Sequence, residues 1–389
     1  MKVSSKKVTS KSGKLVLLFA AAFSFPLSAN ATTNCVFVNS TKSMTLQGSC
    51  TTDETIIIPN GLTLNGQGFK ITAIDPVGGN FKGPILRNAG KSAGVANLFL
   101  RTNLADFCQV EPADKLVGIL FDKAAGTIAG VNITLNKAAG ASTCEEGTAI
   151  QLQSLPYSSK GLYSKVTVKT SSFNYNQLAG IVAQGNINLR VEANLVRSNT
   201  GSPIAQRGIE ASNGVKALIV SNEVIRHSHS PLGDPSYGIL LNGAASSTVL
   251  TNTLNFNDIG IRVSGTSKVS VKGNIIRSST LDGILVDDSN GLPASAVTLW
   301  ANDTQKNGLN GIRVQSVNGL TTKNITKYNI VQRNIGGGIV TEGSLNKIQS
   351  NTATLNDGVD ISDFGTGNLY SRNTCESSTG APVDCPPLP

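Results

Sequence analysis

Apolar and polar residues alternate with a period of two over short segments of the chain, as in Ile261-Arg262-Val263 and Ile312-Arg313-Val314. This period is typical of β-strands that bury one face. The alternating segments are three to five residues long, and no helical pattern of ten or more residues occurs after residue 31. We therefore predict an all-β protein built from short strands.

The strands belong to a repeated unit that starts with Gly and Ile. It recurs in steps of 20 to 30 residues, at Gly180-Ile181, Gly208-Ile209, Gly238-Ile239, Gly260-Ile261, Gly283-Ile284, Gly311-Ile312 and Gly338-Ile339, with Gly358-Val359 as a variant. An Asn follows the Gly after 14 residues in four units, and three more lie at looser spacings: Asn194, Asn222, Asn252, Asn274, then Asn302, Asn351 and Asn373. Such short units bury their inward side chains only by stacking, which predicts a solenoid.

Stacking predicts two internal columns. The isoleucines of the repeat should form one column inside the solenoid: Ile181, Ile209, Ile239, Ile261, Ile284, Ile312 and Ile339. The asparagines should form the other, because Asn tolerates left-handed backbone at a tight bend and its amide can bond the equivalent Asn one coil away.

The repeat of Gly-Ile-x-Val, a turn, an alternating strand and Gly-Asn-x-Ile resembles the right-handed parallel β-helix superfamily, the pectate-lyase-like solenoids. The resemblance covers residues 94–374, and residues 62–71 are similar to the first coil of such proteins. It implies a single-stranded right-handed parallel β-helix of about ten or eleven coils with capped ends. An up-and-down barrel or a propeller is the alternative, although propeller blades need about 40 residues.

Net charge and the first residues together predict export. The formal net charge of +9 includes five lysines before an apolar run that ends near Phe25, followed by Ser28-Ala29-Asn30-Ala31. This is the layout of a signal peptide cleaved after Ala31. Its removal leaves 28 basic and 24 acidic residues, a net charge of about +4, so nucleic acid is not an expected partner. We expect a secreted, periplasmic or cell-surface monomer without a membrane span in the mature chain.

The proposed division of the chain is a signal peptide (1–31), an N-terminal cap with the first coils (32–93), repeats (94–374) and a disulfide loop with a Pro-rich tail (375–389). Six cysteines in an exported chain favour disulfides. Local loop closure favours the pairs Cys35–Cys50, Cys108–Cys144 and Cys375–Cys385 among 15 possible connectivities. The first and last pairs would cap the two ends of the solenoid. Zinc is disfavoured, because no C-x-x-C or C-x-x-H spacing occurs.

The resemblance implies a saccharide groove on the outer face of the Gly-Ile strands. The expected outward residues include Glu210, Arg262, Arg313 and Asp360 in one row and Asp287 in the next. Charged residues of this mixed kind can bind hydroxyls or uronates, and they also occur on any soluble surface. The substrate-binding candidates are Arg207, Glu210, Arg226, Arg262, Asp287 and Arg313.

The loop of residues 226–237 contains both histidines of the chain. Its residues can carry protons in a β-elimination, so the catalytic candidates are His227, His229, Asp234 and Tyr237 from the loop, together with Glu210 of the outward row. Glu210 with Asp234 is the one carboxylate pair to test for glycoside hydrolysis. His227, His229 and Asp234 could also hold copper or zinc. Calcium is conceivable at residues 287–290 or at Asp357, Asp360 and Asp363, without EF-hand spacing.

The motifs of the superfamily's enzymes are missing. Arg-x-Pro-x-x-Arg is absent, and the epimerase-like Asp-Pro-His-Asp survives only as Asp234-Pro235.

Three hypotheses about the function stay open. The chain binds or processes an extracellular polysaccharide or cell-surface glycan, as a lyase, epimerase or hydrolase if it is an enzyme; it is a non-catalytic structural solenoid or adhesin; or it is a metal-accessory protein.

Overall fold

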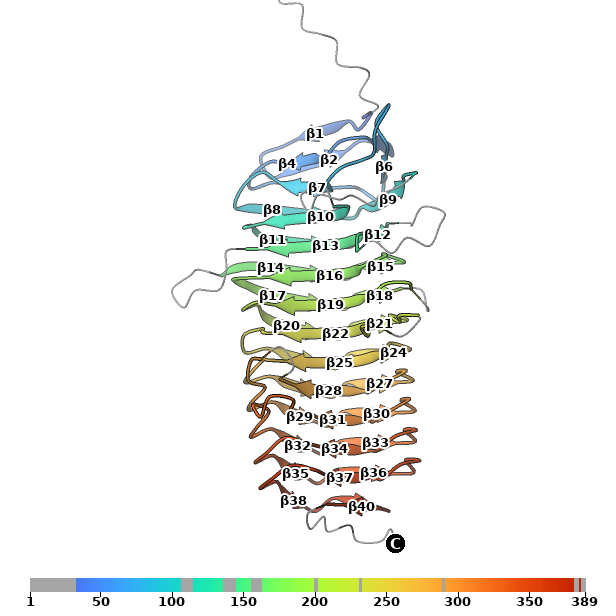
Figure 1. Ribbon diagram of the computed structural model, residues 1–389. Helices are drawn as coiled ribbons and strands as arrows, with labels where there is room; N and C mark the ends of the chain where they lie inside the picture. The colour runs from blue at the N-terminus through green and yellow to red at the C-terminus, as the bar shows by residue number, and fades with distance from the viewer. Residues whose placement is uncertain are drawn as a thin grey trace, which may run out of the picture.

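The strands of the protein wind into a right-handed parallel β-helix. The computed structural model describes residues 33–105, 115–135, 145–154, 163–198, 202–230, 233–288, 291–380 and 385. Their regular structure consists of strands alone, and none of these residues forms a helix that could cross a membrane. The coils stack in chain order from the blue N-terminal end to the red C-terminal end (Figure 1).

The strands form three sheets that run the length of the stack. Sheet A contains β1 (Phe37–Asn39), β2 (Ser43–Leu46), β5 (Thr63–Asn65), β8 (Ser92–Ala96), β11 (Ala125–Ala129), β14 (Ser164–Lys169), β17 (Ile187–Glu192), β20 (Lys216–Val220), β23 (Thr248–Leu250), β26 (Ser270–Lys272), β29 (Thr298–Trp300), β32 (Ile325–Lys327), β35 (Lys347–Gln349) and β38 (Leu369–Ser371). Sheet B contains β3 (Cys50–Thr52), β6 (Lys70–Ile74), β9 (Phe99–Asn103), β12 (Asn132–Thr134), β15 (Ser172–Asn174), β18 (Leu195–Arg197), β21 (Glu223–Ile225), β24 (Thr253–Asn255), β27 (Ile275–Arg277), β30 (Asp303–Gln305), β33 (Ile330–Gln332), β36 (Thr352–Thr354) and β39 (Thr374–Cys375).

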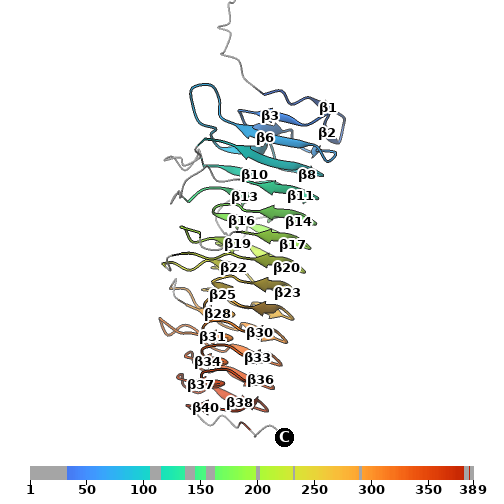
Figure 2. The same ribbon diagram turned by 90° about the vertical axis from the view of Figure 1, so that its right-hand side faces the viewer.

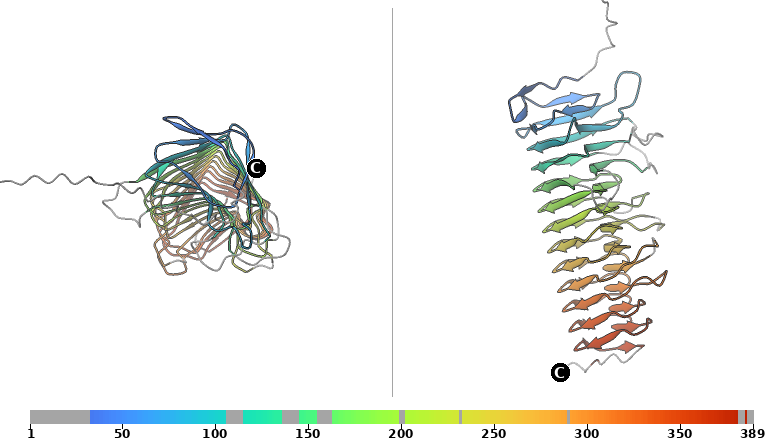
Figure 3. Two further views of the ribbon diagram at one scale, coloured as in Figure 1. Left: turned by 90° about the horizontal axis from the view of Figure 1, so that it is seen from above. Right: turned by 90° about the vertical axis from the view of Figure 1, so that its left-hand side faces the viewer.

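Sheet C holds the Gly-Ile strands of the repeat. It contains β4 (Ile56–Ile58), β7 (Pro84–Asn88), β10 (Val117–Asp122), β13 (Thr148–Gln153), β16 (Ala179–Gln184), β19 (Arg207–Ser212), β22 (Tyr237–Asn242), β25 (Ile259–Ser264), β28 (Ile284–Asp287), β31 (Ile312–Val314), β34 (Ile339–Thr341), β37 (Ile361–Asp363) and β40 (Ser378–Thr379). Neighbouring strands of this sheet are parallel, as in β19 with β22 and β22 with β25. The view along the axis in Figure 3 shows the coils superposed around one core.

The described residues form twelve complete turns of three strands, from β3-β4-β5 to β36-β37-β38. This exceeds the expected ten or eleven coils, because the first turns lack the Gly-Ile signature by which coils were counted. Strand β1 pairs antiparallel with β2 and lies at the N-terminal end of sheet A. Figure 2 shows it above the parallel strands, where it covers an open sheet edge.

The predicted isoleucine column is confirmed. The seven isoleucines are partners in consecutive registers of sheet C, from Ile181 with Ile209 to Ile312 with Ile339. All are fully buried. The glycine before each one is required by close approach: a Cβ at Gly208 would lie 2.5 Å from Cγ1 of Val224, whose strand belongs to sheet B.

The asparagine ladder is also confirmed. Each Nδ2 donates to the Oδ1 of the next Asn at 2.9–3.0 Å, through Asn194, Asn222, Asn252, Asn274, Asn302, Asn329, Asn351 and Asn373. The expected reason for Asn was partly wrong. The left-handed backbone belongs to the preceding residue, with φ of 52° at Ala193, 54° at Ser221 and 51° at Thr251. Asn is therefore needed for its amide.

The last Gly-Val pair of the repeat was placed in the wrong register. Ile361, not Val359, pairs with Ile339, so Asp360 occupies the position of the repeat glycine. Asp360 consequently does not lie in the outward row in which we expected it.

Disulfides join Cys35 to Cys50 and Cys375 to Cys385 at the two ends. The expected Cys108–Cys144 pair and the signal peptide lie outside the described residues.

Candidate functional site

The outer face of sheet C brings charged residues from successive coils into register. Glu210, Leu240, Arg262, Leu285 and Arg313 occupy equivalent positions on five consecutive strands. The neighbouring row contains Ser212, Asn242, Ser264 and Asp287. Because side chains alternate along a strand, both rows point away from the isoleucine column. We call these two rows the strip.

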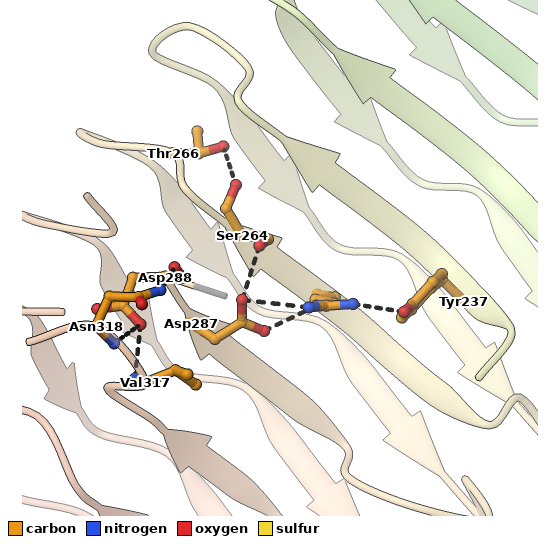
Figure 4. Close-up of polar contacts among 8 residues, drawn as sticks. Tyr237, Ser264, Thr266, Asp287, Asp288, Val317 and Asn318 are labelled. Carbon is orange, nitrogen blue, oxygen red and sulfur yellow. Dashed lines mark hydrogen bonds and ion pairs between the residues drawn. The ribbon is translucent and has the colours of Figure 1, made fainter. Parts of the chain in front are cut away.

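Arg262 lies at the centre of the strip and is held on two sides. Its Nε donates to Oδ2 of Asp287 at 2.8 Å, and its Nη2 donates to Oδ1 at 3.3 Å. Nη1 donates to the hydroxyl of Tyr237, and the guanidinium lies 5.3 Å from the centre of the Tyr237 ring. Figure 4 shows Asp287 and Tyr237 on opposite sides of this guanidinium. The cation is therefore pre-positioned.

Asp287 orients Arg262 from below the surface. Only 1% of Asp287 is exposed, and its Oδ1 also accepts a hydrogen bond from Oγ of Ser264 at 2.7 Å. A ligand on the strip would therefore meet the partly exposed Arg262 rather than the carboxylate. Bidentate arginine–carboxylate pairs of this kind restrict the guanidinium geometrically.

Two further ion pairs flank the centre. Nη1 of Arg207 lies 3.2 Å from Oε2 of Glu210, a residue that is only 5% exposed. Arg313 donates from Nε and Nη2 to Oε1 of Glu342 at 2.9 and 2.7 Å. The arginines of the strip thus have carboxylate partners, so the surface is polar but locally close to neutral.

Apolar side chains lie among these charges. Tyr237, Leu240, Ile259 and Leu285 form a buried cluster separate from the main core, with Leu281 packed against it. Burial raises the pKa of Tyr237, although Arg262 opposes the shift. The hydroxyl therefore stays protonated at neutral pH. Apolar side chains beside a few oriented polar groups are typical of ligand sites.

A family model described as a right-handed β-helix region matches residues 158–319 and 259–381. The two matches together span more than half of the chain. The chain belongs to the right-handed β-helix family. A comparison with curated protein sequences finds no match.

Solved structures that share the fold of this β-helix protein include two epimerases. The periplasmic alginate epimerase AlgG is 13% identical, with a TM-score of 0.65 over 86% of this chain and 85% of that one. The A-module of the Azotobacter vinelandii mannuronan C-5 epimerase AlgE4 is 15% identical, with a TM-score of 0.53 over 87% and 88%. At such identities, the likeness concerns the fold alone.

The two histidines of this β-helix protein do not form a pair. His227 is 2% exposed, and its Nδ1 lies 3.1 Å from Oδ1 of Asn257 in a second buried polar column. Burial lowers the pKa of His227 to about 4. We leave His227 out of the site, because it cannot reach a ligand on the outer face. The loop sequence carries no signal for this, since the burial depends on the next coil.

His229 and Asp234 lie on the loop that leads into β22. Nδ1 of His229 is 2.7 Å from the carbonyl oxygen of Asp234, whose side chain is exposed. Among the described residues, no group of three His, Cys, Asp or Glu is arranged to hold a metal. Arg226 follows β21 in sheet B and does not share the strands of the strip.

Three of the carboxylates considered for calcium, those of Asp288, Asp360 and Asp363, accept hydrogen bonds from backbone N–H groups. Asp288 accepts hydrogen bonds from the N–H groups of Val317 and Asn318, which are drawn in Figure 4, and from that of Leu320. Burial would raise the pKa of Asp288, but these bonds lower it. Asp360 accepts from the N–H groups of residues 376 and 377. Asp363 accepts from the N–H of residue 365. Ser289 and Asn290 lie outside the described residues.

Proposed function

We propose that this protein is exported and binds an extracellular polysaccharide along the strip. The observation that supports this proposal is the fixed position of Arg262 between Asp287 and Tyr237, beside an apolar cluster. Sugars present hydroxyls at their edges and C–H groups on their faces. Oriented polar groups around an apolar patch suit both. The fold is compatible, since the structurally similar AlgG and AlgE4 are named for epimerisation of polysaccharides.

The register of the strip favours a chain of sugars over a single sugar. Its equivalent positions repeat on neighbouring strands about 4.8 Å apart, so five coils present a surface about 19 Å long. Polar groups therefore recur along the axis of the stack, from Glu210 to Arg313. A polysaccharide laid along this axis would meet a polar side chain of this row at every second coil.

A second candidate function is proton transfer at a uronate, as in β-elimination or C5 epimerisation. Tyr237 favours it, because its hydroxyl keeps its proton and is held in place by the guanidinium of Arg262. Tyr237 would donate the proton. His229 or Asp234, on the preceding loop, would be the candidates for the base. Glu210 suits a hydrolase less well, since it is buried against Arg207.

The binding test compares the purified chain with its Tyr237→Phe and Arg313→Gln variants on immobilised polysaccharides. Tyr237→Phe removes one hydroxyl and keeps the ring, so we expect affinity to fall about threefold to tenfold with an unchanged thermal unfolding midpoint. Lys306→Gln, in a turn after sheet B, is the control. Absence of binding to acidic and neutral polysaccharides alike would refute the proposed function.

Turnover is tested with the same polymers. A lyase releases unsaturated products that absorb in the ultraviolet, and an epimerase changes the uronate signals in NMR spectra. Either activity should disappear in Tyr237→Phe. Binding without any turnover would leave the first proposal and reject the second. Export is tested by the N-terminal sequence of the chain recovered outside the cytoplasm, which should begin after Ala31.

A further inference from the structure

A groove runs beside the strip, along the corner where sheet C turns into sheet A. Its volume is about 1350 Å³. Its lining comes from the strand ends and turns of seven successive coils, from Asp122 at the end of β10 and Lys123 after it to Leu292 and Pro293 before β29. Six steps of about 4.8 Å give a length of about 29 Å, several times that of a sugar ring.

Three lysines line this groove without carboxylate partners. Lys123, Lys216 and Lys268 are exposed, and none of their ammonium groups forms an ion pair with the described residues. The carboxylate in the described lining is Asp122, and Arg87 lies 3.3 Å from it. The described lining of the groove is therefore net positive. A local excess of positive charge attracts an anionic ligand.

The lysines are spaced along the groove rather than gathered at one point. Lys216 and Lys268 are two coils apart, about 10 Å, and Lys123 lies three coils before Lys216, about 14 Å. A single small anion would meet only one of them. A linear polymer with charges along its length would meet all three.

Glycines form part of the floor between the lysines. Gly185, Gly243 and Gly265 have φ of 89°, 60° and 54°, a left-handed conformation that favours glycine at this turn. One aromatic side chain, Tyr163, occurs in the described lining. Proteins that bind single-stranded nucleic acid usually present several aromatic side chains for base stacking, so this lining fits a polyanion without bases better.

The groove and the strip share an edge. Gln153 and Gln184 line the groove and stand in the same register row as Ser264 and Asp287 of the strip. One polymer could therefore contact both surfaces. We propose that the groove binds the carboxylates of an acidic polysaccharide, a polyuronate, through Lys123, Lys216 and Lys268. This rests on the proposed function and adds the charge class of the polymer and a second contact surface.

The experiment uses two probes of equal length: a uronate oligomer and the same oligomer with its carboxyl groups methyl-esterified. The groove variant is Lys123→Gln/Lys216→Gln/Lys268→Gln. The control variant, Lys70→Gln/Lys306→Gln/Lys347→Gln, loses the same charge elsewhere. It is matched in backbone, since Lys306 has a positive φ of 57° like Lys123 and Lys268, and Lys347 begins a sheet A strand like Lys216. Circular dichroism checks folding.

We expect the unaltered chain and the control to bind the uronate at least about tenfold more tightly than the ester, and the groove variant to lose this preference. A groove variant that keeps the preference, or a control that loses it equally, overturns the assignment. So does tighter binding of a single-stranded oligonucleotide of equal charge. Equal binding of uronate and ester refutes the groove alone, whereas binding of neither probe nor any other polysaccharide refutes the proposed function too.

Discussion

The strip and the groove lie side by side and share the coils of β19 to β28, but they hold their basic residues in opposite states. In the strip, Arg262 and Arg313 each have a carboxylate partner within hydrogen-bond distance. In the groove, Lys216 and Lys268 are exposed and form no ion pair with the described residues. The strip is therefore ordered and nearly neutral, and the groove is charged.

This difference shows that the presence of basic residues does not by itself make a binding site for anions. A buried carboxylate that pairs with Arg262 fixes the direction of its N–H groups and cancels most of its field. Such a group recognises shape and hydroxyls. Lysines that have no carboxylate partner keep their electrostatic field and attract anionic groups of a ligand. Four measurements test this distinction.

The largest expected effect concerns the stability of the strip. Asp287→Ala removes the acceptor of Arg262 and of Ser264, and the breaking of a buried pair leaves a partly buried cation. We expect the free energy of unfolding to fall by about 3 kcal/mol in urea titrations. Asp303→Ala, which breaks the exposed pair with Arg277, should cost less than about 1 kcal/mol.

A double variant decides whether the unpaired cation causes this loss. Arg262→Met together with Asp287→Ala should recover part of the stability, because neither charge is then left alone. If Asp287→Ala destabilises no more than Asp303→Ala, the carboxylate is not a buried orienting group and the contrast between strip and groove fails.

The next effect is the acid sensitivity of the coil behind the strip. Burial holds His227 neutral, with a pKa of about 4 against an ordinary value of 6.5. Below pH 6.5 the unfolded chain binds this proton more readily than the folded one, so stability falls as pH falls towards 4. His227→Asn, which places an amide against Asn257, should reduce the stability difference between pH 7 and pH 4 by about 3 kcal/mol.

This variant also separates stability from binding. If His227 were a proton carrier on the strip, His227→Asn would change the pH profile of ligand binding or turnover at pH 6 to 8. We expect those profiles to remain unchanged, with affinity measured by calorimetry at each pH. An unchanged acid sensitivity of unfolding would contradict the buried placement of His227.

Added salt should weaken ligand binding to the groove and leave ligand binding to the strip nearly unchanged. Between 0.1 and 1 M salt, the screening length falls from about 10 to about 3 Å. We expect the affinity for a uronate oligomer to fall about tenfold, and the affinity for its methyl ester to change less than about twofold. An equal salt effect on both ligands would show that the two surfaces do not divide the recognition in this way.

The smallest effects come from single residues. Lys216→Gln should weaken uronate binding about threefold to fivefold and leave ester binding unchanged, because one exposed charge contributes at most about 1 kcal/mol. Arg313→Gln should weaken both ligands about equally, since its charge is already paired with Glu342. Equilibrium titrations of both ligands against both variants give the four dissociation constants that check this prediction.

Much of the fold could be predicted because each coil repeats the same environment. Ile181 and its equivalents meet the same neighbours in every turn, so one residue type recurs at one position. The Asn ladder follows for the same reason, and local loop closure suggested the terminal pairs Cys35–Cys50 and Cys375–Cys385. The early coils were undercounted, since their interior is built from other side chains, such as Phe81 and Phe121.

The candidate site could be predicted only in part. The outward rows were readable, but the pairing of Arg262 with Asp287 depends on side chains from two coils that are 25 residues apart. The burial of His227 depends on Asn257, one coil later. The register of Asp360 depends on Ile361 rather than on the nearest glycine. Each of these contacts crosses between coils, where loop length decides which residues meet.

The sequence by itself determined that this chain stacks as a β-helix, because periodic glycines, isoleucines and asparagines can bury and bond only with their copies one coil away. Only the tertiary structure decided which charges are paired and which remain free. Lys216 and Arg262 both look like basic residues at strand positions, yet one faces a groove and the other a buried carboxylate. That distinction arises from the three-dimensional neighbours of each charge, and it determines the ligand that each surface can bind.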